Sequence, residues 1–268
     1  MSRPQWAPDD IDLSRPNAAR IYDYFLGGTH NFSVDRDLGD KVLAVIPGGR
    51  IQAVANRRFL QRAVTYCVEA GIRQFLDIGS GIPTVGNVHQ VAGRLAPESR
   101  VVYVDMDPVA IAHSLAILAE NENATAFQED LRHIDQILDH PELHAMLDLN
   151  QPVAVLMVAV LHVIPDEDQP AKILARLRDA MAPGSHLVIA HGTDEGDPEQ
   201  ANRVRAMSAQ TNTPMCFRSR SAIQGLFEGF EIVEPGVVWA SQWRPDPEDP
   251  DDPRPELSNN YAAVGRKL

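Results

Sequence analysis

The sequence predicts an α/β fold built on one doubly wound, mostly parallel sheet with a helical cap before it. Short β-branched runs alternate with helical patterns through the centre of the 268-residue chain, as in successive strand–helix–strand units. The run 153–160 (VAVLMVAV) is apolar throughout, which a strand covered on both faces requires. The chain ends in two extended segments with no helix between them, which predicts an antiparallel pair at the end of the sheet.

The cap is assigned to residues 1–70 and belongs to the same domain as the core at 71–268. Within the cap, RPNAARIYDYFLGG predicts a helix that ends at Gly27 and Gly28, followed by an irregular turn. Apolar residues recur at helical spacing through 51–70, directly before a glycine at the position where helices favour one. The cap either covers one edge of the sheet or forms a lid over a ligand, because glycine lets the main chain approach a ligand closely.

The core contains five strand patterns, each followed by a turn or a helix. In chain order the predicted strands are 73–78, 100–107, 125–130, 153–160 and 186–190. Pro108 marks the start of a helix that runs to about residue 120. Pro183 and Gly184 stop another helix, which closes at 177–181. The extended segments 230–243 and 260–265 form the antiparallel end.

The chain is acidic, which bears on its partners. It carries 37 Asp and Glu against 24 Lys and Arg, for a net charge of -13. This balance argues against nucleic acid or an anionic membrane as a partner, because phosphate contacts need a basic face. Residues 244–256 (RPDPEDPDDPRPE) hold six of the acids, and their five prolines predict a solvated hairpin loop.

The two cysteines and the apolar runs favour a cytoplasmic protein. Cys67 and Cys216 lie far apart without CxxC spacing, which supports neither a disulfide framework nor a cysteine zinc site. The opening MSRPQWAPDD has no apolar stretch of the kind found in a signal peptide. The longest apolar run, 153–164, contains His162 and is too short to span a bilayer.

The central motif is a Gly-x-Gly turn after the first strand, FLDIGSG at 75–81. Glycines at a strand-to-helix turn let a ligand touch the main chain. The dinucleotide fingerprint needs a third small residue where this chain has Thr84 after Pro83, which disfavours a pyrophosphate ligand. A phosphate loop ending in GK[ST] and a Gly-x-Ser-x-Gly nucleophile turn do not occur in the sequence, so we expect neither ATP hydrolysis by such a loop nor an α/β-hydrolase.

Three carboxylates lie at the ends of three successive strands. Asp77 is near the end of the first strand, Asp105 ends the second and Asp130 ends the third. Ligands of open α/β sheets bind at the carboxyl ends of the strands, where a carboxylate can accept hydrogen bonds from a ribose diol. Asp105 and Asp130 can also simply cap the helices that follow. The set of three predicts a nucleoside site.

These motifs resemble a known group. DIGSG at 77–81, DMD at 105–107 and EDL at 129–131 resemble the first three motifs of the class I S-adenosylmethionine-dependent methyltransferases. The resemblance implies a Rossmann-like, seven-stranded sheet whose last strand is antiparallel. The opening RPNAARIYDYFLGG resembles an actinobacterial family described as methyltransferase-like, which extends the resemblance over nearly the whole chain.

The resemblance assigns roles at the methionine end of the cofactor. It implies that Gly79, Ser80 and Gly81 pass under the methionine part of S-adenosylmethionine and that Asp77 lies near its ammonium. Ala159, at the end of the fourth strand, would line the side of the sulfur. S-adenosylmethionine has no pyrophosphate and is cationic at sulfur, so neither the missing third glycine nor the acidic pocket argues against it.

The resemblance also assigns roles at the adenosine end. Asp105 would bind both ribose hydroxyls, and Met106 would pack on the face of the adenine. Asp130 would accept a hydrogen bond from the adenine amino group, and the backbone amide of Leu131 would reach a ring nitrogen.

The catalytic residues are less marked in the sequence. His162 follows the fourth strand at the rim where an acceptor would lie, so it is the candidate general base, and His191 ends the fifth strand similarly. Either histidine can instead be structural and bond a loop carbonyl. We expect no metal site from His162, Asp166 and Asp168, because the two acids also suit the first turn of a helix. Tyr22, Tyr24 and Gly28 of the cap are the candidate lid residues.

The leading hypothesis is a methyltransferase that uses S-adenosylmethionine and acts on a small-molecule acceptor by in-line transfer. The fourth strand is followed by LHVIP at 161–165 rather than by Asn/Asp-Pro-Pro-Tyr, which disfavours a nucleic-acid N-methyltransferase of that kind. Two alternatives stay open on the residues alone. One is a non-catalytic module that binds S-adenosylmethionine as a sensor, and the other is an NAD(P)-dependent oxidoreductase.

Overall fold

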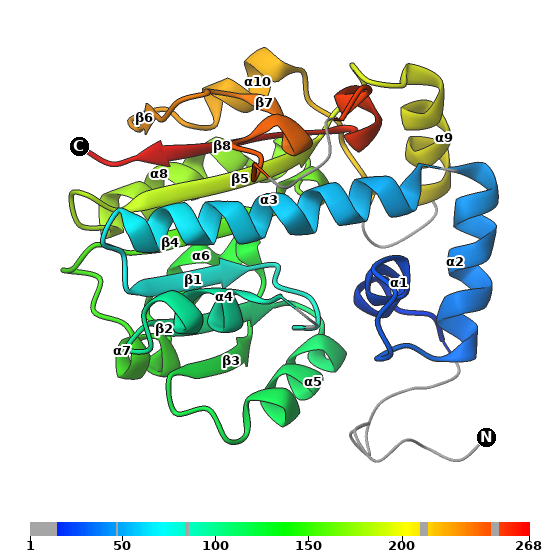
Figure 1. Ribbon diagram of the computed structural model, residues 1–268. Helices are drawn as coiled ribbons and strands as arrows, with labels where there is room; N and C mark the ends of the chain where they lie inside the picture. Colours follow the sequence, from blue (N-terminus) through cyan, green and yellow to red (C-terminus); the bar gives the residue numbers. More distant parts are fainter. Residues whose placement is uncertain (1–14, 47, 84–85, 210–213, 248–251) are drawn as a thin grey trace.

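The computed structural model describes residues 15–46, 48–83, 86–209, 214–247 and 252–268, and its centre is one sheet (Figure 1). The strand order is β3-β2-β1-β4-β5-β8-β6, and β7 also pairs with β8. All pairs from β3 to β5 are parallel, whereas β8 is antiparallel to β5, β6 and β7. The strands are β1 (Gln74–Ile78), β2 (Arg100–Asp105), β3 (Ala124–Gln128), β4 (Ala154–Val158), β5 (His186–Gly192), β6 (Glu231–Ile232), β7 (Val238–Trp239) and β8 (Asn260–Arg266). The predicted Rossmann-like sheet is confirmed.

The last position of the sheet is one strand broken into two pieces. β6 pairs with the end of β8, and β7 pairs with an earlier part of the same edge. The eight strands therefore fill the seven expected positions. Residues 230–243, predicted to be extended throughout, instead form these two short strands and a 3-10 turn, η4 (Ala240–Gln242). Of the acidic loop at 244–256, residues 244–247 are exposed, and 248–251 lie outside the described residues.

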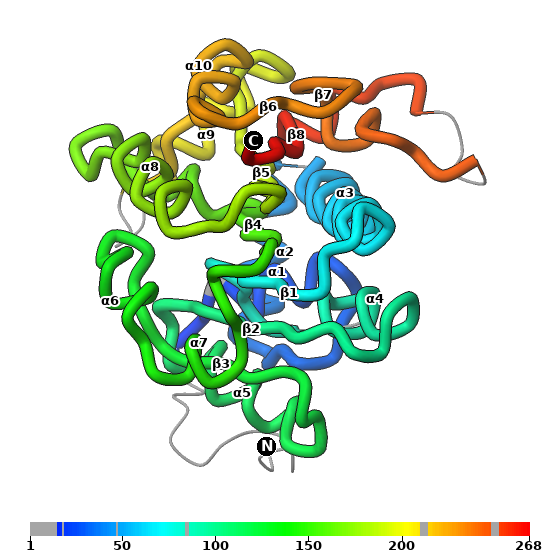
Figure 2. The backbone as a smooth tube through the Cα atoms, turned by 90° about the vertical axis from the view of Figure 1, so that its left-hand side faces the viewer, coloured from blue at the N-terminus to red at the C-terminus, as the bar shows by residue number. Residues whose placement is uncertain are grey.

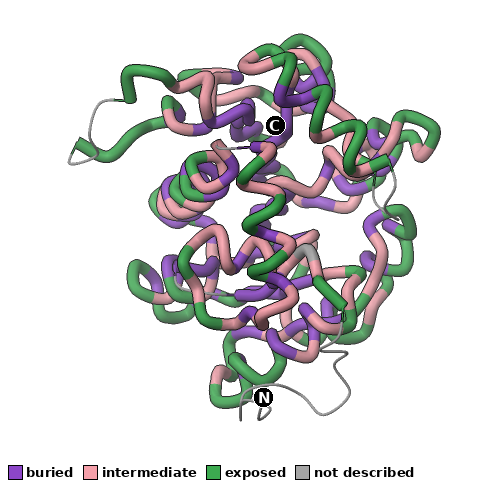
Figure 3. Tube along the Cα trace, turned by 90° about the vertical axis from the view of Figure 1, so that its right-hand side faces the viewer, coloured by how far each residue is buried: buried purple, intermediate pink, exposed green. Residues whose placement is uncertain are grey.

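Helices cover both faces of the sheet, as a doubly wound fold requires (Figure 2). One face packs against the helices α3 (Gly49–Glu69), α4 (Val88–Leu95) and α5 (Pro108–Leu118). The other packs against α6 (Ile134–Leu138), α7 (Pro141–Met146), α8 (Pro170–Ala180) and α10 (Arg220–Gly225). Buried residues concentrate in the strands and on the inner sides of these helices (Figure 3). Within the described part of the chain, no helix is both long enough and apolar enough to cross a membrane.

The helix predicted at 51–70 is α3, which packs along the sheet (Figure 1). Phe59, Val64 and Cys67 are fully buried in the core, whereas Ile51 is half exposed near the beginning of the helix. Gly71 follows the helix at φ 93°, the left-handed conformation that its C-terminus favours. The second half of α3 therefore anchors the helix, and its first half reaches past the sheet toward the N-terminal helices.

The cap differs from the expectation in one element. α1 (Ala18–Phe25) ends before Gly27 as predicted, but the predicted irregular turn gives way to a second helix, α2 (Ser33–Val45). Gly39 lies in the middle of α2 and weakens its helical signal, because glycine is a poor helix former. A β-carbon at Gly39 would lie 2.7 Å from the Tyr24 ring, so this glycine allows α1 and α2 to pack closely. No specific expectation from the sequence covered the helices α6, α7, α9 (Pro198–Ser208) and α10.

Candidate functional site

The glycine turn after β1 is shaped by its neighbours. Gly79 and Gly81 adopt left-handed conformations with φ of 71° and 61°. The amides of Gly79 and Ser80 donate to the carbonyl of Val104 at 2.8 and 3.2 Å, so the turn crosses the end of β2. A β-carbon on Gly79 would lie 2.5 Å from the β-carbon of Val160. Backbone conformation and packing therefore both require glycine at this position.

Asp105 ends β2 and points its carboxylate at this turn. Its Oδ2 accepts a hydrogen bond from the Gly81 amide at 2.8 Å, and its Oδ1 accepts one from the Asp107 amide at 2.9 Å. Burial raises the pKa of Asp105, and these amide hydrogen bonds oppose the rise. Each oxygen retains a lone pair, so the fixed carboxylate can still accept from a diol. Beside it, Met106 is 45% exposed and offers an apolar surface.

Asp77, in β1, lies buried beneath the same turn. Its side chain is only 6% exposed, and burial raises its pKa to about 7, while the charge of Arg57 opposes the rise and that of Asp105 adds to it. Among the described residues none donates a hydrogen bond to this carboxyl group. A buried carboxylate without a donor is costly, so this position suits a cationic ligand group.

Asp130 is placed after β3 but is already paired. It caps η1 (Leu131–His133) by accepting from the Arg132 amide at 2.9 Å, and it also forms an ion pair with the Arg132 guanidinium. Partial burial works against ionisation, but the hydrogen bonds and charge of Arg132 outweigh it and lower the pKa of Asp130. Leu131 buries its side chain in the core, so only its backbone can face a ligand. The adenine contacts expected here would share Asp130 with Arg132.

The end of β4 bends back over the glycine turn. Ala159 has a φ of 64°, which is uncommon for a residue with a β-carbon, and its amide donates to the Ala190 carbonyl at 2.9 Å. The bend brings Val160 onto Gly79, as the close approach of their β-positions shows. Ala159 therefore lies beside the glycine turn, where the resemblance places the cofactor sulfur.

His162 lies in η2 (Leu161–Val163), directly after this bend. Burial, and then the charge of Arg218, lowers its pKa to about 4, so the imidazole is neutral at physiological pH. Its Nδ1 is buried and has no hydrogen-bond partner among the described residues. The ring packs edge-on against His191, with centroids 6.0 Å apart. In the neutral imidazole this Nδ1 can accept or donate one hydrogen bond.

His191 is fully engaged within the protein. Its Nδ1 donates to the Gly192 carbonyl at 2.7 Å, and its Nε2 accepts from Arg218 Nη1 at 2.7 Å. Burial lowers the pKa of His191 to about 3, which keeps the ring in this neutral form. Arg218 also donates to the carbonyls of Leu161 and Ile164, and so ties the loop after β4 to the end of β5. The structure thus gives His191 the contacts of a structural histidine.

α1 brings Tyr22 toward the strand ends. Its hydroxyl donates to the Ala53 carbonyl and accepts from the Asn56 side chain, both at 3.2 Å. In the same helix, Ala19 lies 3.8 Å from the position that a β-carbon on Gly81 would take. The first turn of α1 therefore lies over the glycine turn.

Tyr24 and Gly28 contact other residues of the cap. The Tyr24 hydroxyl donates to Asp40 at 2.7 Å, and Arg50 stacks on the ring at 4.6 Å. A β-carbon on Gly28 would overlap the carboxylate of Asp23, so this glycine makes room for a buried side chain of the cap rather than for a ligand. The described contacts of Tyr24 and Gly28 lie within the cap, and their part in a lid stays a prediction.

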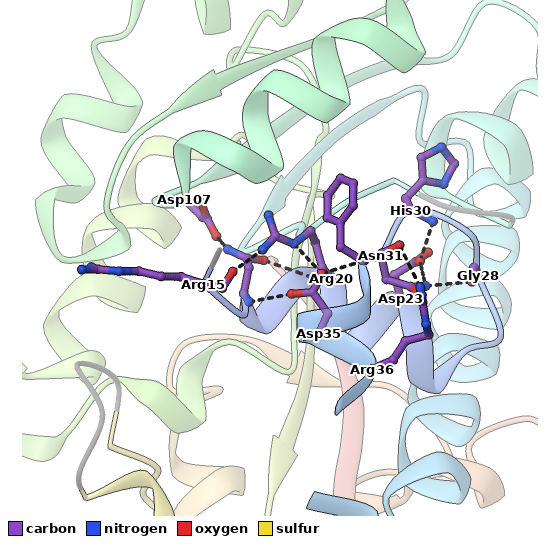
Figure 4. Close-up of polar contacts among 11 residues, drawn as sticks. Arg15, Arg20, Asp23, Gly28, His30, Asn31, Asp35, Arg36 and Asp107 are labelled. Atoms are coloured by element: carbon purple, nitrogen blue, oxygen red, sulfur yellow. Dashed lines mark hydrogen bonds and ion pairs between the residues drawn. The ribbon is translucent and has the colours of Figure 1, made fainter. Parts of the chain in front are cut away.

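A buried polar network joins the cap to the end of β2 (Figure 4). Arg20 and Asp35 form an ion pair at 2.8 Å, with side chains only 1% and 0% exposed. Asp35 also accepts from the Asn17 amide at 2.9 Å, and the Asn17 side chain donates to Asp107. Asp107 in turn lies two residues from Asp105, so the position of α1 is coupled to the acidic end of β2.

A cavity of about 830 Å³ lies between α3 and α4. Gly93 and Arg94, near the end of α4, line part of it. A crossover helix runs back along the sheet, so its end lies toward the amino ends of the strands. Gly86, directly before α4, also lines it, so the cavity extends along the whole of this helix.

Comparison with known proteins identifies the family of this chain. A family model described as S-adenosyl methyltransferase matches residues 4–268. The chain belongs to the S-adenosyl methyltransferase family. It is 41% identical to a putative methyltransferase from Thermobifida fusca YX, with a TM-score of 0.90 over 98% of this chain and 99% of the other. It is equally identical to a DUF574 family protein from Streptomyces avermitilis MA-4680, with a TM-score of 0.91 over 96% and 99% of the two chains.

More distant structures share the fold alone. An O-methyltransferase family protein from Burkholderia thailandensis is 14% identical, with a TM-score of 0.52 over 94% of this chain and 64% of that one. Comparison with curated proteins gives no match. Family membership makes the chain an S-adenosylmethionine-dependent methyltransferase, and it favours neither the non-catalytic module nor the oxidoreductase.

The residues at the strand ends fit the methyltransferase cofactor. The two glycines leave a bare main chain that β-carbons would obstruct, and Asp105 offers a fixed acceptor pair. Asp77 offers a buried carboxylate that accepts from no donor among the described residues. Thr84, which disfavours a pyrophosphate ligand, lies outside the described residues.

Several polar residues near the site were not predicted. Arg57 and Asn17 come from the cap, and Arg218 comes from the segment after α9. In an amphipathic helix a polar residue is expected on the solvent-exposed face, so helical periodicity does not predict that Arg57 lies near the site. The only local hint was that Asn17 precedes an apolar helical pattern, which is typical of an N-cap.

Proposed function

We propose that this methyltransferase binds S-adenosylmethionine across the carboxyl ends of β1, β2, β3 and β4 and transfers its methyl group to a small-molecule acceptor. The observation that carries the proposal is the acidic pair around the glycine turn. Asp105 is held there by the Gly81 amide, and Asp77 is buried without a donor from the part of the chain that the structure describes. In this role Asp105 accepts from both ribose hydroxyls, and Asp77 faces the ammonium.

The proposed adenosine side uses the surface beyond Asp105. Met106 packs on the adenine face, since it is exposed next to the carboxylate. Asp130 accepts from the adenine amino group while it retains Arg132, because a carboxylate offers about four acceptor sites. The Leu131 amide begins a helix and therefore lacks a partner within that helix. In the proposed complex this amide donates to a ring nitrogen.

The proposed acceptor site lies beside Ala159 and His162, on the far side of the glycine turn. Bound S-adenosylmethionine supplies an activated methyl group, so the protein mainly has to hold the acceptor in line with it. His162 accepts a hydrogen bond from the acceptor through its unused Nδ1. With a pKa near 4 it is a weak base, which suits a neutral nucleophile or one that has already lost its proton.

The acceptor class rests on charge and on the cap. A net charge of -13 disfavours polyanionic acceptors such as nucleic acid. α1 lies over the glycine turn and limits the space at the strand ends, which favours a small acceptor. The two free cysteines, one buried and one half-buried, accord with the proposed cytoplasmic location.

Calorimetry with S-adenosylmethionine and S-adenosylhomocysteine tests the cofactor site. We expect saturable binding that Asp105→Ala weakens by at least about 100-fold, since two hydrogen bonds to a charged group are lost. The exposed Glu120→Ala is the matched control and should leave affinity unchanged. Absence of binding at millimolar ligand, or equal effects of the two variants, would contradict the proposed site.

Product formation tests the acceptor. We expect S-adenosylhomocysteine to accumulate with one class in a panel of small phenols, amines, carboxylic acids and thiols, and not with oligonucleotides. Turnover on oligonucleotides alone would refute the proposed acceptor class and leave the cofactor site standing.

A further inference from the structure

A second cavity, of about 390 Å³, lies at the amino ends of the strands. Three of its lining residues, Ile72, Pro152 and Gly184, come shortly before the parallel strands β1, β4 and β5. The rest of its wall comes from the last turn of α3 and the end of β8, which lie at the end of α3 remote from α1 (Figure 1). The glycine turn follows β1, so it and this cavity lie at opposite ends of the strands.

A buried histidine, His186 at the start of β5, lines this cavity. It is 2% exposed, and neither ring nitrogen has a hydrogen-bond partner among the described residues. Burial, and then the charge of Arg266, lowers the pKa of His186 to about 4, while the nearby Gly184 carbonyl opposes this shift. Even with one nitrogen turned toward that carbonyl, the other is left without a partner. Native proteins bury few polar atoms in this state, so the remaining nitrogen indicates a polar ligand.

Arg266 brings a positive charge to the same cavity. It is the cross-strand neighbour of His186 in the β5–β8 pair, so the two side chains lie on the same face of the sheet. Glu231 of β6 is its other cross-strand neighbour, but no ion pair joins Arg266 to an acid in the described part of the chain. None of the described residues that line the cavity is acidic. In a chain with a net charge of -13, this local positive charge favours an anionic ligand.

Tyr66, in the last turn of α3, gives the cavity an aromatic wall. Its ring meets His186 edge-on with centroids 5.8 Å apart, and the Arg244 guanidinium lies 4.3 Å from the centre of the ring. These two contacts hold the ring in place before a ligand binds. Ile72 and Pro152 add further apolar surface. A cavity of this size, with apolar walls and a few polar groups, is typical of small-molecule sites.

The polar groups of the cavity define the chemistry of its ligand. The planar guanidinium of Arg266 matches a carboxylate, which it can bind through two parallel hydrogen bonds. The remaining nitrogen of neutral His186 is a donor in one tautomer and an acceptor in the other, and a hydroxyl group satisfies either. A phosphate group fits less well, because it carries more charge than the single arginine in the wall can balance.

We propose that this cavity is a second ligand site, which binds a small hydroxycarboxylic acid with an apolar body. Arg266 binds the carboxylate, His186 bonds the hydroxyl group, and Tyr66 packs on the apolar body. The site shares no residue with the proposed cofactor site, so the two ligands bind independently.

Ligands that differ by one group test each contact on the wild-type protein. Mandelate carries a carboxylate, a hydroxyl group and a phenyl body, whereas phenylacetate lacks the hydroxyl group and mandelamide lacks the charge. In an NMR titration of the full chain we expect saturable binding of mandelate. Phenylacetate should bind about 2- to 10-fold more weakly, the range for a neutral hydrogen bond, and mandelamide about 10-fold or more. Inorganic phosphate should also bind more weakly than mandelate.

Two variants assign these preferences to residues. His186→Phe keeps an aromatic ring beside Tyr66 but removes both nitrogens, so it should bind mandelate and phenylacetate equally. Arg266→Met should weaken mandelate by about 10-fold and mandelamide by less than about 2-fold. The exposed Arg203→Met in α9 is the matched control and should leave every affinity unchanged.

Saturating S-adenosylhomocysteine should not alter the affinity for mandelate, because the two sites lie at opposite ends of the strands. Competition between these ligands would place mandelate elsewhere and overturn the proposal. Equal affinities of the wild type for mandelate, phenylacetate and mandelamide would overturn it too. Absence of saturable binding at millimolar mandelate would show that the cavity holds water only.

Discussion

Replacement of Gly79 by alanine separates two physical demands on the glycine turn. The first is conformational, because a left-handed residue with a β-carbon costs about 1–2 kcal/mol. The second is steric, because the new β-carbon would lie 2.5 Å from the β-carbon of Val160 and would overlap its Cγ2. Overpacking of this kind costs about 1–3 kcal/mol. Gly79→Ala should therefore lower the free energy of unfolding by about 2–5 kcal/mol.

A double-mutant cycle with Val160 isolates the steric part. Val160→Gly removes the opposing side chain, so we expect the cost of Gly79→Ala to fall by about 1–3 kcal/mol in that background. Val160→Ala removes the γ-carbons but keeps the close β-carbon, and should recover less. Urea unfolding of the single and double variants, followed by circular dichroism, measures each free energy.

Gly81 supplies the matched control for this cycle. It shares the left-handed conformation, with φ of 61°, but a β-carbon there would meet only Ala19, at 3.8 Å. Gly81→Ala should cost only the conformational 1–2 kcal/mol, roughly, and should show no coupling to Val160. The steric argument is refuted if Gly79→Ala lowers the free energy of unfolding no more than Gly81→Ala does. It is also refuted if the coupling energy with Val160 is no larger for Gly79→Ala than for Gly81→Ala.

Three further results are expected. Asp35→Ala removes three hydrogen bonds and leaves Arg20 as an unpaired buried charge, so urea unfolding should show a loss of about 3–5 kcal/mol. Folding raises the pKa of Asp77 from 3.8 to about 7, so the folded state holds the proton more tightly than the unfolded state. The free energy of unfolding should therefore fall as the pH rises from about 4 to 7. Asp77→Asn should flatten this profile when denaturation is measured across that pH range. Deletion of residues 1–30 should weaken S-adenosylhomocysteine in calorimetry if α1 acts as a lid, whereas unchanged affinity would show that it only covers the sheet.

The sheet was predictable because its signals are local. The run 153–160 reads as a doubly covered strand on its own residues, and the Gly-x-Gly turn and Asp105 follow strands at a spacing that the parallel topology brings together. α2 was missed because Gly39 serves packing against Tyr24, a contact that helical periodicity does not encode.

Side-chain partners from distant segments were the part that the sequence could not supply. Arg218 lies 27 residues after His191 in the chain, yet it donates to Nε2 of that histidine and makes it structural. Asp130 is a local exception, because Arg132, only two residues later, pairs with it. Arg57 influences the pKa of Asp77 only because α3 places its charge near that carboxyl group. Each role depends on where folding brings a second residue.

The broken strand at the end of the sheet bears on how this protein behaves at high concentration. A long, regular edge strand exposes a row of amides and carbonyls to which another molecule can add a strand, the first step of many aggregation processes. Here the edge consists of two two-residue pieces, β6 and β7, with Pro235 between them. Neither piece presents enough consecutive backbone groups to pair with an incoming chain. The interruption therefore favours a dispersed protein, independently of its negative charge.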